Sequence, residues 1–374
     1  MTTFQRKART VHTAFLPVTA LGTLLLSATL MPGTASAVQT IDLTIGSSHP
    51  TTIPWVGMIP DVFIPKVNEI LAEEGEYEVK WTEAYAGQLY GTNATLTSIQ
   101  DGIADIGWVF SYMEPSRMPL SQISAYTPFT TSDPELMLDV MNELVRSVPE
   151  LRAEWEEHDV VFLGATASDT YDIYTNFPVE SLDDLKGARI SAPGVLGVWL
   201  EPVGSAPVDG TLASYYTDIQ TGVSQGVVGL ATGNLSARIY EVSPYITQVN
   251  LGVVFSGGLA INQFAWDSLP EPVQDALIEA GQTYTRAHGR DMAERYGSSI
   301  ERMVELGAEQ STPVQVNALS DEQRQQWIDS MPDLAQQWVE RNEGRGLPAR
   351  ELLSTYMDAM RERGHEPELS WDQN

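Results

Sequence analysis

The sequence predicts an α/β fold of two lobes, joined by crossing strands and followed by a helical C-terminal tail. Segments with strand patterns alternate with segments of helical spacing from residue 41 to residue 263, which is typical of α/β proteins. Beyond Pro270 the pattern is almost wholly helical. The chain after residue 37 is longer than one core usually supports, roughly 250–300 residues. Because neither an internal repeat nor a low-complexity linker divides it, we expect strands to cross between the lobes.

The individual elements follow from hydrophobic periodicity and helix-end signals. Gly75 ends the first helix, and Asp133-Pro134 opens a long amphipathic one. We expect strands over residues 41–47, 77–85, 101–110, 160–165, 170–177, 188–193, 226–231 and 256–263. We expect helices over residues 61–73, 92–102, 133–148, 181–187, 195–204, 213–222, 271–306, 321–342 and 348–363. Lobe I should comprise residues 38–164 and about 250–290, and lobe II residues 165–249 and about 291–374 with the C-terminal helices.

The first 37 residues have the layout of a secretory signal peptide. A basic segment at residues 6–9 precedes an apolar stretch over residues 14–30, and Ala35-Ser36-Ala37 supplies the small residues of a cleavage site. An uncleaved anchor helix is the alternative, but prolines and a glycine interrupt the stretch. We therefore expect export to the periplasm with cleavage after Ala37. No later stretch approaches the roughly 20 apolar residues that a membrane span needs.

The charge of the chain limits its partners. The formal net charge is −29 at pH 7, which disfavours nucleic acid and anionic membrane surfaces. The sequence contains no cysteine, so disulfides and thiolate metal sites are excluded. The acidic runs are interpreted as a solvated surface. A sharper hypothesis is adaptation to high salt, where screening offsets the self-repulsion of the chain.

The sequence contains no catalytic or cofactor motif in the structural context that such a motif requires. The string Gly222-Val223-Ser224-Gln225-Gly226 matches the G-x-S-x-G nucleophile elbow, which needs a strand before the serine and a helix after it. Here the predicted helix precedes the serine and the strand follows it. The histidines are scattered without a second ligand at i+3 or i+4, and no P-loop or calcium loop is present. We expect neither an enzyme nor a cofactor or metal.

Aromatic and acidic residues gather where predicted strands end or begin. Ligands of open α/β sheets collect at the carboxyl ends of strands and between domains, so these residues as a set are interpreted as the walls of a cleft. Each one alone is more often structural. The set is Trp55, Glu83, Tyr85, Trp108, Phe110, Tyr112, Asp169, Tyr171 and Tyr174.

The order of the segments resembles the solute-binding proteins of TRAP transporters, of the DctP type. The resemblance covers nearly the whole chain after residue 37, and it rests on several weak motifs in the right order. They are His49 near the end of the first strand, "AGQLYG" at 86–91, "DGIADIG" at 101–107, "YTPFTTSDPE" at 126–135, "SLDDLKGARISAPG" at 181–194, "YYTDIQTGVSQG" at 215–226 and "LAINQFAWDSLPEPVQDAL" at 259–277. The resemblance implies a two-lobed periplasmic-binding-protein fold. It also implies a binder that closes on one small molecule and delivers it to a TRAP membrane permease.

One position departs from the family pattern. In that pattern the Lys-Gly turn is followed by a basic residue and, two positions on, by an arginine that pairs with a substrate carboxylate. Arg189 matches the first position, but the second is Ser191, which cannot supply a bidentate partner. Replacement of the missing arginine by Arg189, Arg117 or Arg238 stays open.

These observations predict a small polar ligand held by aromatic faces with a carboxylate nearby. Our preferred ligand class is a small amine or amino alcohol, because aromatic faces attract ammonium groups. A carboxylate or a neutral polyol is the alternative ligand, and an ABC-transporter binding protein is the alternative class. We expect a monomer. The predicted ligand-binding residues are His49, Trp55, Glu83, Trp108, Phe110 and Tyr112 from the first part of the chain, with Asp169, Tyr171, Ser191, Tyr215 and Asn234 from the second.

Overall fold

The computed structural model describes residues 37–373, so the predicted signal peptide lies outside the described residues except for Ala37. Alternating and buried apolar segments form a ten-stranded sheet in this part of the chain. The strands are β1 (Gln39–Gly46), β2 (Tyr77–Ala84), β3 (Ile106–Val109), β4 (Val160–Thr175), β5 (Arg189–Ala192), β6 (Ala206–Asp209), β7 (Gly226–Leu230), β8 (Tyr245–Gln248), β9 (Val253–Asn262) and β10 (Gln315–Ala318).

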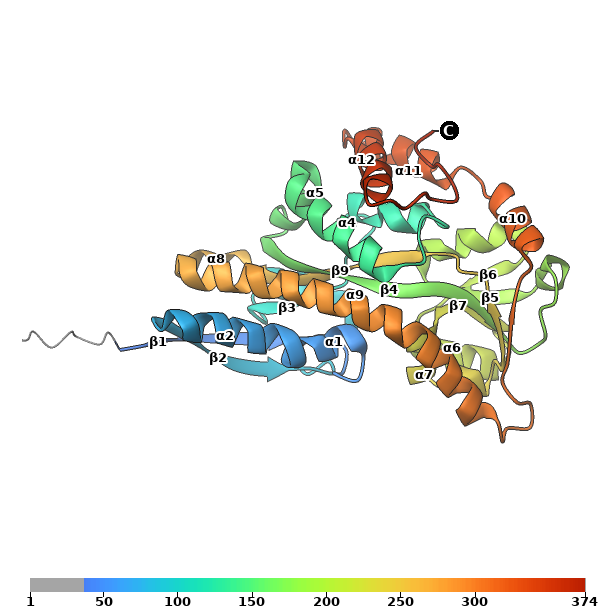
Figure 1. Ribbon diagram of the computed structural model, residues 1–374, viewed down its shortest axis with the longest axis horizontal. Helices are drawn as coiled ribbons and strands as arrows, with labels where there is room; N and C mark the ends of the chain where they lie inside the picture. Colours follow the sequence, from blue (N-terminus) through green and yellow to red (C-terminus); the bar gives the residue numbers. More distant parts are fainter. Residues whose placement is uncertain (1–36, 374) are drawn as a thin grey trace, which may run out of the picture. The chain divides into compact units, whose positions relative to one another are not determined.

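Helices cover both faces of the sheet and form the C-terminal tail (Figure 1). The α-helices are α1 (Pro54–Met58), α2 (Ile64–Glu74), α3 (Thr95–Gln100), α4 (Pro134–Ser147), α5 (Pro149–Glu156), α6 (Leu212–Gln220), α7 (Ala231–Ser236), α8 (Gln263–Ser268), α9 (Glu271–Gly307), α10 (Asp321–Asp329), α11 (Leu334–Glu343) and α12 (Ala349–Glu362). A π-helix (Ile59–Phe63) joins α1 to α2, and a 3₁₀-helix (Gly194–Val203) follows β5. No helix of the described residues has the length and apolar character that a membrane span requires.

The strand order β2-β1-β3-β9-β4-β7-β5-β6 places two parallel groups on either side of a central pair. β1 pairs in parallel with β2 and β3, and β5 pairs in parallel with β6 and β7. β9 and β4 lie antiparallel to each other and to the groups beside them. Strands therefore cross from one half of the sheet to the other, and the predicted α/β fold with crossing strands is confirmed.

β4 is one strand of 16 residues, where the sequence predicts two. The register between β4 and β9 shifts at Phe162/Gly164, Thr166/Ala167 and Ala167/Thr170, so the strand bends without ending. Its interior carries buried polar residues, among them Asp169 and Asp172. These polar residues interrupt the apolar pattern, which is why the sequence predicts an end near residue 165.

Three other predictions about elements are wrong. The predicted helix over residues 321–342 is two helices, α10 and α11, separated around Pro332. The region after Pro270 also contains a strand, β10, which gains its partner from β8 far back in the chain. Neither β8 nor β6 stands out from the sequence, because each is only four residues long. Ile103 is 49% exposed, since β3 begins only at Ile106.

Buried tryptophans attach the helical tail to the rest of the chain. The Trp327 indole donates a hydrogen bond to the Trp199 carbonyl oxygen, and the Trp338 indole donates to the Pro119 carbonyl oxygen. The Trp371 indole donates to the Pro128 carbonyl oxygen. All three tryptophans are buried, and each thus combines a large apolar contact with a satisfied N–H group.

The 37-residue helix α9 is about 55 Å long at 1.5 Å per residue and contacts elements from both halves of the sheet. It packs on β4 and α4, and it contacts α2 and α1 along its N-terminal half and α7 along its C-terminal half (Figure 1). It lies very close to β4 at Gly281, where a Cβ atom would lie 2.0 Å from the Leu163 carbonyl oxygen. Gly164 on β4 is equally constrained, since its Cβ would lie 2.4 Å from the Gly281 oxygen.

We predict that Gly281→Ala destabilises the protein by about 1–3 kcal/mol, because the added methyl group must displace the backbone of β4. Gly297→Ala on the same helix is the matched control, since its Cβ would meet no atom within 4 Å. That control should be neutral or stabilising by up to about 1 kcal/mol. Denaturant unfolding of both variants measures the difference, and equal effects would contradict the close contact between α9 and β4.

Candidate functional site

A cavity of about 560 Å³ lies among the carboxyl ends of the strands. His49 follows β1, Phe110 follows β3, Pro193 follows β5 and Thr211 follows β6, while Leu230 ends β7. This is the edge where open α/β sheets bind ligands. The lining comprises His49, Trp55, Gly91, Thr92, Asn93, Ala94, Phe110, Met113, Tyr171, Pro193, Thr211, Leu212, Ala213, Tyr215, Val228, Gly229, Leu230 and Asn234.

A smaller chamber of about 50 Å³ shares Trp55, Phe110, Tyr171 and Leu230 with this cavity. Five further residues line it: Trp108, Tyr112, Ser168, Val254 and Ser256. Because the two spaces share these walls, we treat them together as one site and call it the central cavity.

One wall of the central cavity is a continuous aromatic cluster. Trp108 stacks on Phe110 with ring centroids 4.8 Å apart, and it lies 5.5 Å from the Trp55 ring and 5.4 Å from the His49 ring. Tyr112 extends the cluster, 5.8 Å from Phe110. Alternation along β3 and the residues after it puts Trp108, Phe110 and Tyr112 at every second position. The cluster thus offers flat apolar faces to a ligand.

Two indole N–H groups in this wall differ in their partners. The Trp108 Nε1 donates to the Thr166 hydroxyl at 2.9 Å, which orients that ring. The Trp55 Nε1 is buried and has no hydrogen-bond partner within the described residues, although the Trp55 carbonyl oxygen accepts from the Tyr284 hydroxyl. A buried N–H group without a partner is costly, so the Trp55 indole is a donor that a bound molecule would satisfy.

A hydrogen bond from the Tyr112 hydroxyl to the Pro193 carbonyl oxygen, 2.6 Å long, joins the aromatic wall to the loop after β5. A Cβ at Gly194 would lie 3.4 Å from that hydroxyl, so the loop approaches Tyr112 closely. This bond connects the two sides of the central cavity directly.

The lining of the central cavity also contains an unpaired amide. Asn234 on α7 is fully buried, and in the described structure neither its Nδ2 nor its Oδ1 has a hydrogen-bond partner. A Cβ at Gly229 would lie 2.4 Å from the Asn234 Nδ2, so glycine at 229 makes room for the amide. Asn234 can therefore both donate to and accept from a ligand.

A buried carboxyl group contacts α7, the helix that carries Asn234. Asp169 is fully buried in β4, and its Oδ2 accepts from the Thr232 backbone N–H at 2.9 Å. Its Oδ1 has no partner within the described residues. Burial raises the pKa of Asp169 to about 7, against the hydrogen bond from Thr232. Asp169 therefore changes charge near neutral pH.

A second buried carboxyl group in β4 is fully paired. The Asp172 Oδ1 accepts from the backbone N–H groups of Val249 and Asn250, and its Oδ2 accepts from the Tyr296 hydroxyl at 2.7 Å. Burial raises the pKa of Asp172 as well. Because its acceptors are used, Asp172 anchors the segment before β9 and is a structural group.

The lining of the central cavity contains no lysine or arginine among the described residues. His49 is its one ionisable base, and burial lowers the pKa of this imidazole. Three arginines were considered as replacements for the family arginine that is Ser191 in this chain. All three make their hydrogen bonds outside the cavity. Arg189 donates to the Val223 and Gly222 carbonyl oxygens.

The other two candidate arginines are also occupied outside the cavity. Arg117 donates to the Thr97 hydroxyl and the Gln100 side chain, and Arg238 pairs with Glu241 three residues on. None of the three lines the cavity, so the described structure brings no guanidinium to it.

Eight of the eleven predicted ligand-binding residues line the central cavity, and three do not. Glu83 is exposed near the end of the edge strand β2, where it accepts from the Tyr85 hydroxyl. Asp169 lies behind the lining, and Ser191 is fully buried in β5 with its hydroxyl unpaired. The residues brought together are His49, Trp55, Trp108, Phe110, Tyr112, Tyr171, Tyr215 and Asn234.

Sequence reasoning missed the small and apolar part of the lining. Pro193, Thr211 and Leu230 lie at the carboxyl ends of β5, β6 and β7. The strand-end rule points to these positions, but the side chains carry no chemical signal of their own. The loop at residues 91–94 does not directly follow a strand, so the strand-end rule does not mark it as part of the lining.

The serine of the G-x-S-x-G string and the histidine that follows it in the chain lie in different settings. Ser224 is fully buried in the turn between α6 and β7, and its hydroxyl has no partner. His288 is buried in α9, with its Nε2 on the Ala167 carbonyl oxygen. No group of three or more His, Cys, Asp or Glu side chains among the described residues is placed to hold a metal ion.

Comparisons with known proteins agree with this geometry. The family model of DctP, described as bacterial extracellular solute-binding protein, family 7, matches residues 47–342. The C4-dicarboxylate-binding periplasmic protein DctP of Shewanella loihica is 26% identical over 269 residues, covering 69% of this chain and 74% of that protein. The ectoine-binding periplasmic protein TeaA of Halomonas elongata is 24% identical over 312 residues, covering 81% of this chain and 86% of that protein.

A solved structure shows the same fold. A TRAP periplasmic solute-binding protein from Desulfovibrio salexigens, in an open complex, superimposes with a TM-score of 0.72 at 24% identity. The match covers 88% of this chain and 98% of that one. The fold is thus the two-lobed α/β fold of TRAP periplasmic binding proteins, as predicted. The chain belongs to the DctP family of bacterial extracellular solute-binding proteins, a family of binders rather than enzymes.

We predict that Asp169→Asn changes how stability depends on pH. The native pKa of Asp169, about 7, lies above the value of about 3.9 expected for an unfolded aspartate, so Asp169 stabilises the fold in acid. That stabilisation is lost as the pH rises from about 4 to 7. An isosteric neutral amide removes this loss. Relative to the wild type, the variant should therefore gain about 2–3 kcal/mol in unfolding free energy between pH 5 and pH 8.

Urea unfolding of both proteins at pH 5 and pH 8 measures this shift. Glu154, whose pKa burial also raises to about 7, is present in both proteins and cancels in the comparison. A free-energy difference between variant and wild type that stays constant between the two pH values would contradict the burial of a titrating Asp169.

Proposed function

We propose that this protein captures a small amine or amino alcohol in the periplasm and delivers it to the membrane permease of a TRAP transporter. The family supports the role of a TRAP solute-binding protein. The ligand class rests on one observation, which is that no lysine or arginine of the described residues lines this aromatic cavity. A carboxylate enclosed in such a cavity would lose its hydration without gaining an ionic partner.

A small cation fits the same walls. The faces of Trp55, Trp108 and Phe110 attract an ammonium group, by roughly 0.5–2 kcal/mol for each favourable contact. Asp169 supplies a negative charge behind Tyr171 once it ionises, and a bound cation favours that ionisation. The Trp55 indole and the Asn234 amide are free to bind hydroxyl groups or other polar atoms of the ligand.

A neutral polyol is the second candidate. The unpaired amide of Asn234 and the unpaired indole N–H of Trp55 can bind hydroxyl groups without any charge on the ligand. In this case the aromatic cluster would stack on the apolar face of the molecule. The binding of dicarboxylates named for the Shewanella loihica relative is the third candidate, and it would require a cation to enter the cavity on closure.

The capture mechanism follows from the contacts across the central cavity. We propose a hinge in the crossing strands β4 and β9, with lobe I at residues 38–164 and about 250–290 and lobe II in the remainder. The hydrogen bond from Tyr112 to Pro193 would help to hold the closed form. The mature protein would begin at Val38 and act as a monomer with the permease subunits as partner.

The first test is a thermal-shift screen of the mature protein with small amines, amino alcohols, polyols, and mono- and dicarboxylates at matched ionic strength. A ligand present at about 100 times its dissociation constant adds roughly 2.7 kcal/mol to the unfolding free energy, which is enough for a shift of several degrees. We expect shifts from amines or amino alcohols. Shifts from carboxylates alone would contradict the proposed ligand class and leave the transporter role unaffected.

The second test uses an aliphatic amine found by this screen, since such an amine stays protonated at both pH 6 and pH 8. Its affinity, measured by calorimetry, should rise up to about tenfold between these pH values as Asp169 ionises. Asp169→Asn should weaken binding and abolish the pH dependence. An equal affinity of the wild type at pH 6 and pH 8 would contradict a contribution of the ionised Asp169 carboxylate to binding of the amine.

A further inference from the structure

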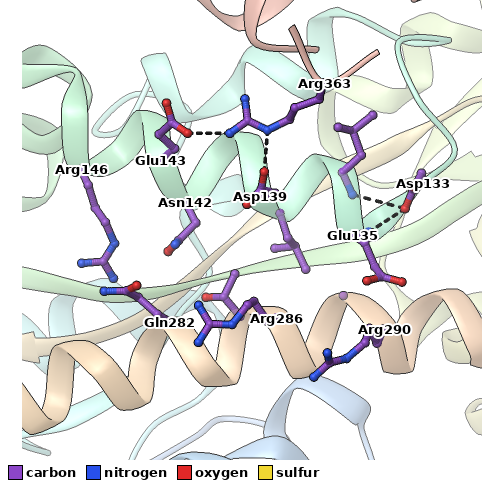
Figure 2. Close-up of a pocket in the computed structure, with 14 residues that line it drawn as sticks. Asp133, Glu135, Asp139, Asn142, Glu143, Arg146, Gln282, Arg286, Arg290 and Arg363 are labelled. Carbon is purple, nitrogen blue, oxygen red and sulfur yellow. Dashed lines mark hydrogen bonds and ion pairs between the residues drawn. The ribbon is translucent and has the colours of Figure 1, made fainter. Parts of the chain in front are cut away.

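A second cavity, about 610 Å³ in volume, lies outside the central cavity, in the groove between α4 and α9 (Figure 2). α9 contacts α4 closely at one point, where a Cβ on Gly289 would lie 3.0 Å from the Glu135 Cα. The lining comprises Asp133, Glu135, Leu136, Leu138, Asp139, Asn142, Glu143, Arg146, Gln282, Thr285, Arg286, Gly289, Arg290 and Arg363. We call it the α4–α9 groove.

Most acidic side chains of the groove already have partners. Asp139 and Glu143 both pair with Arg363, which reaches them from the C-terminal tail. The Asp133 carboxylate caps α4 by accepting from the backbone N–H groups of Glu135 and Leu136. Glu135 lies at the end of the groove that also holds Arg290 (Figure 2). The opposite end therefore has no free carboxylate among the described residues.

At that opposite end lies Arg146, whose guanidinium is fixed by contacts with the protein but has one N–H group without an acceptor among the described residues. The Arg146 Nη2 donates to the Leu163 carbonyl oxygen, and the guanidinium lies over the Phe162 ring at 5.5 Å from its centroid. Its Nε is buried and has no hydrogen-bond partner within the described residues. No carboxylate of the described chain forms a salt bridge with Arg146, although the protein is strongly acidic. The Arg146 guanidinium is thus held in one orientation, and its Nε–H group is available to an additional acceptor.

Polar side chains converge on Arg146 from both helices. Asn142 lies one turn earlier on α4, and its Oδ1 is buried without a partner. Gln282 and Arg286 face it from α9, and Figure 2 shows these four side chains gathered at the same end of the groove. Arg286 makes one long hydrogen bond, 3.3 Å to the Thr283 hydroxyl, and no salt bridge within the described residues. The Asn142 amide can present either its oxygen or its N–H₂ group.

We propose that this end of the α4–α9 groove binds a small oxyanion, held by Arg146 and Arg286 with the side-chain amides of Asn142 and Gln282. Two planar guanidinium groups and two amide groups provide several N–H donors, the arrangement that suits the oxygens of a sulfate, phosphate or carboxylate. The site lies apart from the central cavity and shares no lining residue with it. A bound oxyanion would fasten α9, the helix that contacts both halves of the sheet, to α4.

The test uses sulfate as the probe and the mature protein labelled with ¹⁵N. The arginine Nε–H signals are followed by NMR while sodium sulfate replaces sodium chloride at constant ionic strength, which removes general screening effects. Signals of Arg146 and Arg286 are assigned by their loss in Arg146→Gln and Arg286→Gln. We expect both signals to shift and to saturate with one common midpoint. A parallel titration with acetate distinguishes a carboxylate from a tetrahedral anion.

The variants separate a specific site from general attraction to arginine. Arg286→Gln should raise the sulfate midpoint, read from the Arg146 signal, at least fivefold. Gln282→Glu should abolish saturation, because it places a negative charge in the site. Arg290→Gln, on the same helix at the Glu135 end, is the matched control and should change the midpoint less than twofold.

Three results would overturn the proposal. They are linear shifts without saturation in the wild type, different midpoints for Arg146 and Arg286, or midpoints that Arg286→Gln and Gln282→Glu leave unchanged. Since Gln282→Glu alters a partly exposed side chain without shortening it, this variant keeps the test decisive if Arg286→Gln misfolds. The outcome does not depend on the ligand of the central cavity.

Discussion

The close contact of α9 with β4 is the constraint on which the rest of this structure depends. Gly164 and Gly281 let the helix lie directly against the strand backbone, and β4 with β9 connects the two parallel groups of strands. The carboxyl ends of β1, β3, β5, β6 and β7 consequently surround one space. A binding cavity at this place is thus a result of topology, and the side chains decide only what it accepts.

The side chains of that cavity are the basis of the proposed ligand class. The lining includes stacked aromatic rings, and within the described residues its Trp55 indole N–H and Asn234 amide are unpaired; burial raises the pKa of Asp169, a buried carboxyl group in β4, to about 7. No guanidinium group of the described residues lines this cavity: Arg189 binds carbonyl oxygens after α6, and Arg146 lies in the α4–α9 groove. The two proposals therefore place an anion in the α4–α9 groove and a cation or neutral molecule in the cavity.

Much of the fold and the aromatic part of the site can be predicted from the sequence, because alternation and capping are local signals. Trp108, Phe110 and Tyr112 are found by their spacing at the end of a strand. Glu83 also lies at the end of a strand, so its position in the sequence predicts it equally as a cavity residue. Its exposure to solvent follows from the tertiary structure. The single strand β4 and the pairing of β8 with β10 depend on contacts between distant segments, which local patterns do not encode. Ser191 carries the family departure, yet its burial in β5 is visible only in the structure.

The central claim is that the cavity recognises its ligand without a cation of the protein. A crystal structure of the mature protein, grown with the molecule that gives the largest thermal shift, tests this most directly. The account predicts an ammonium or hydroxyl group against Trp55, Trp108 and Phe110, with hydrogen bonds to the Trp55 indole and the Asn234 amide. A ligand carboxylate paired with a lysine or arginine of this chain would contradict it.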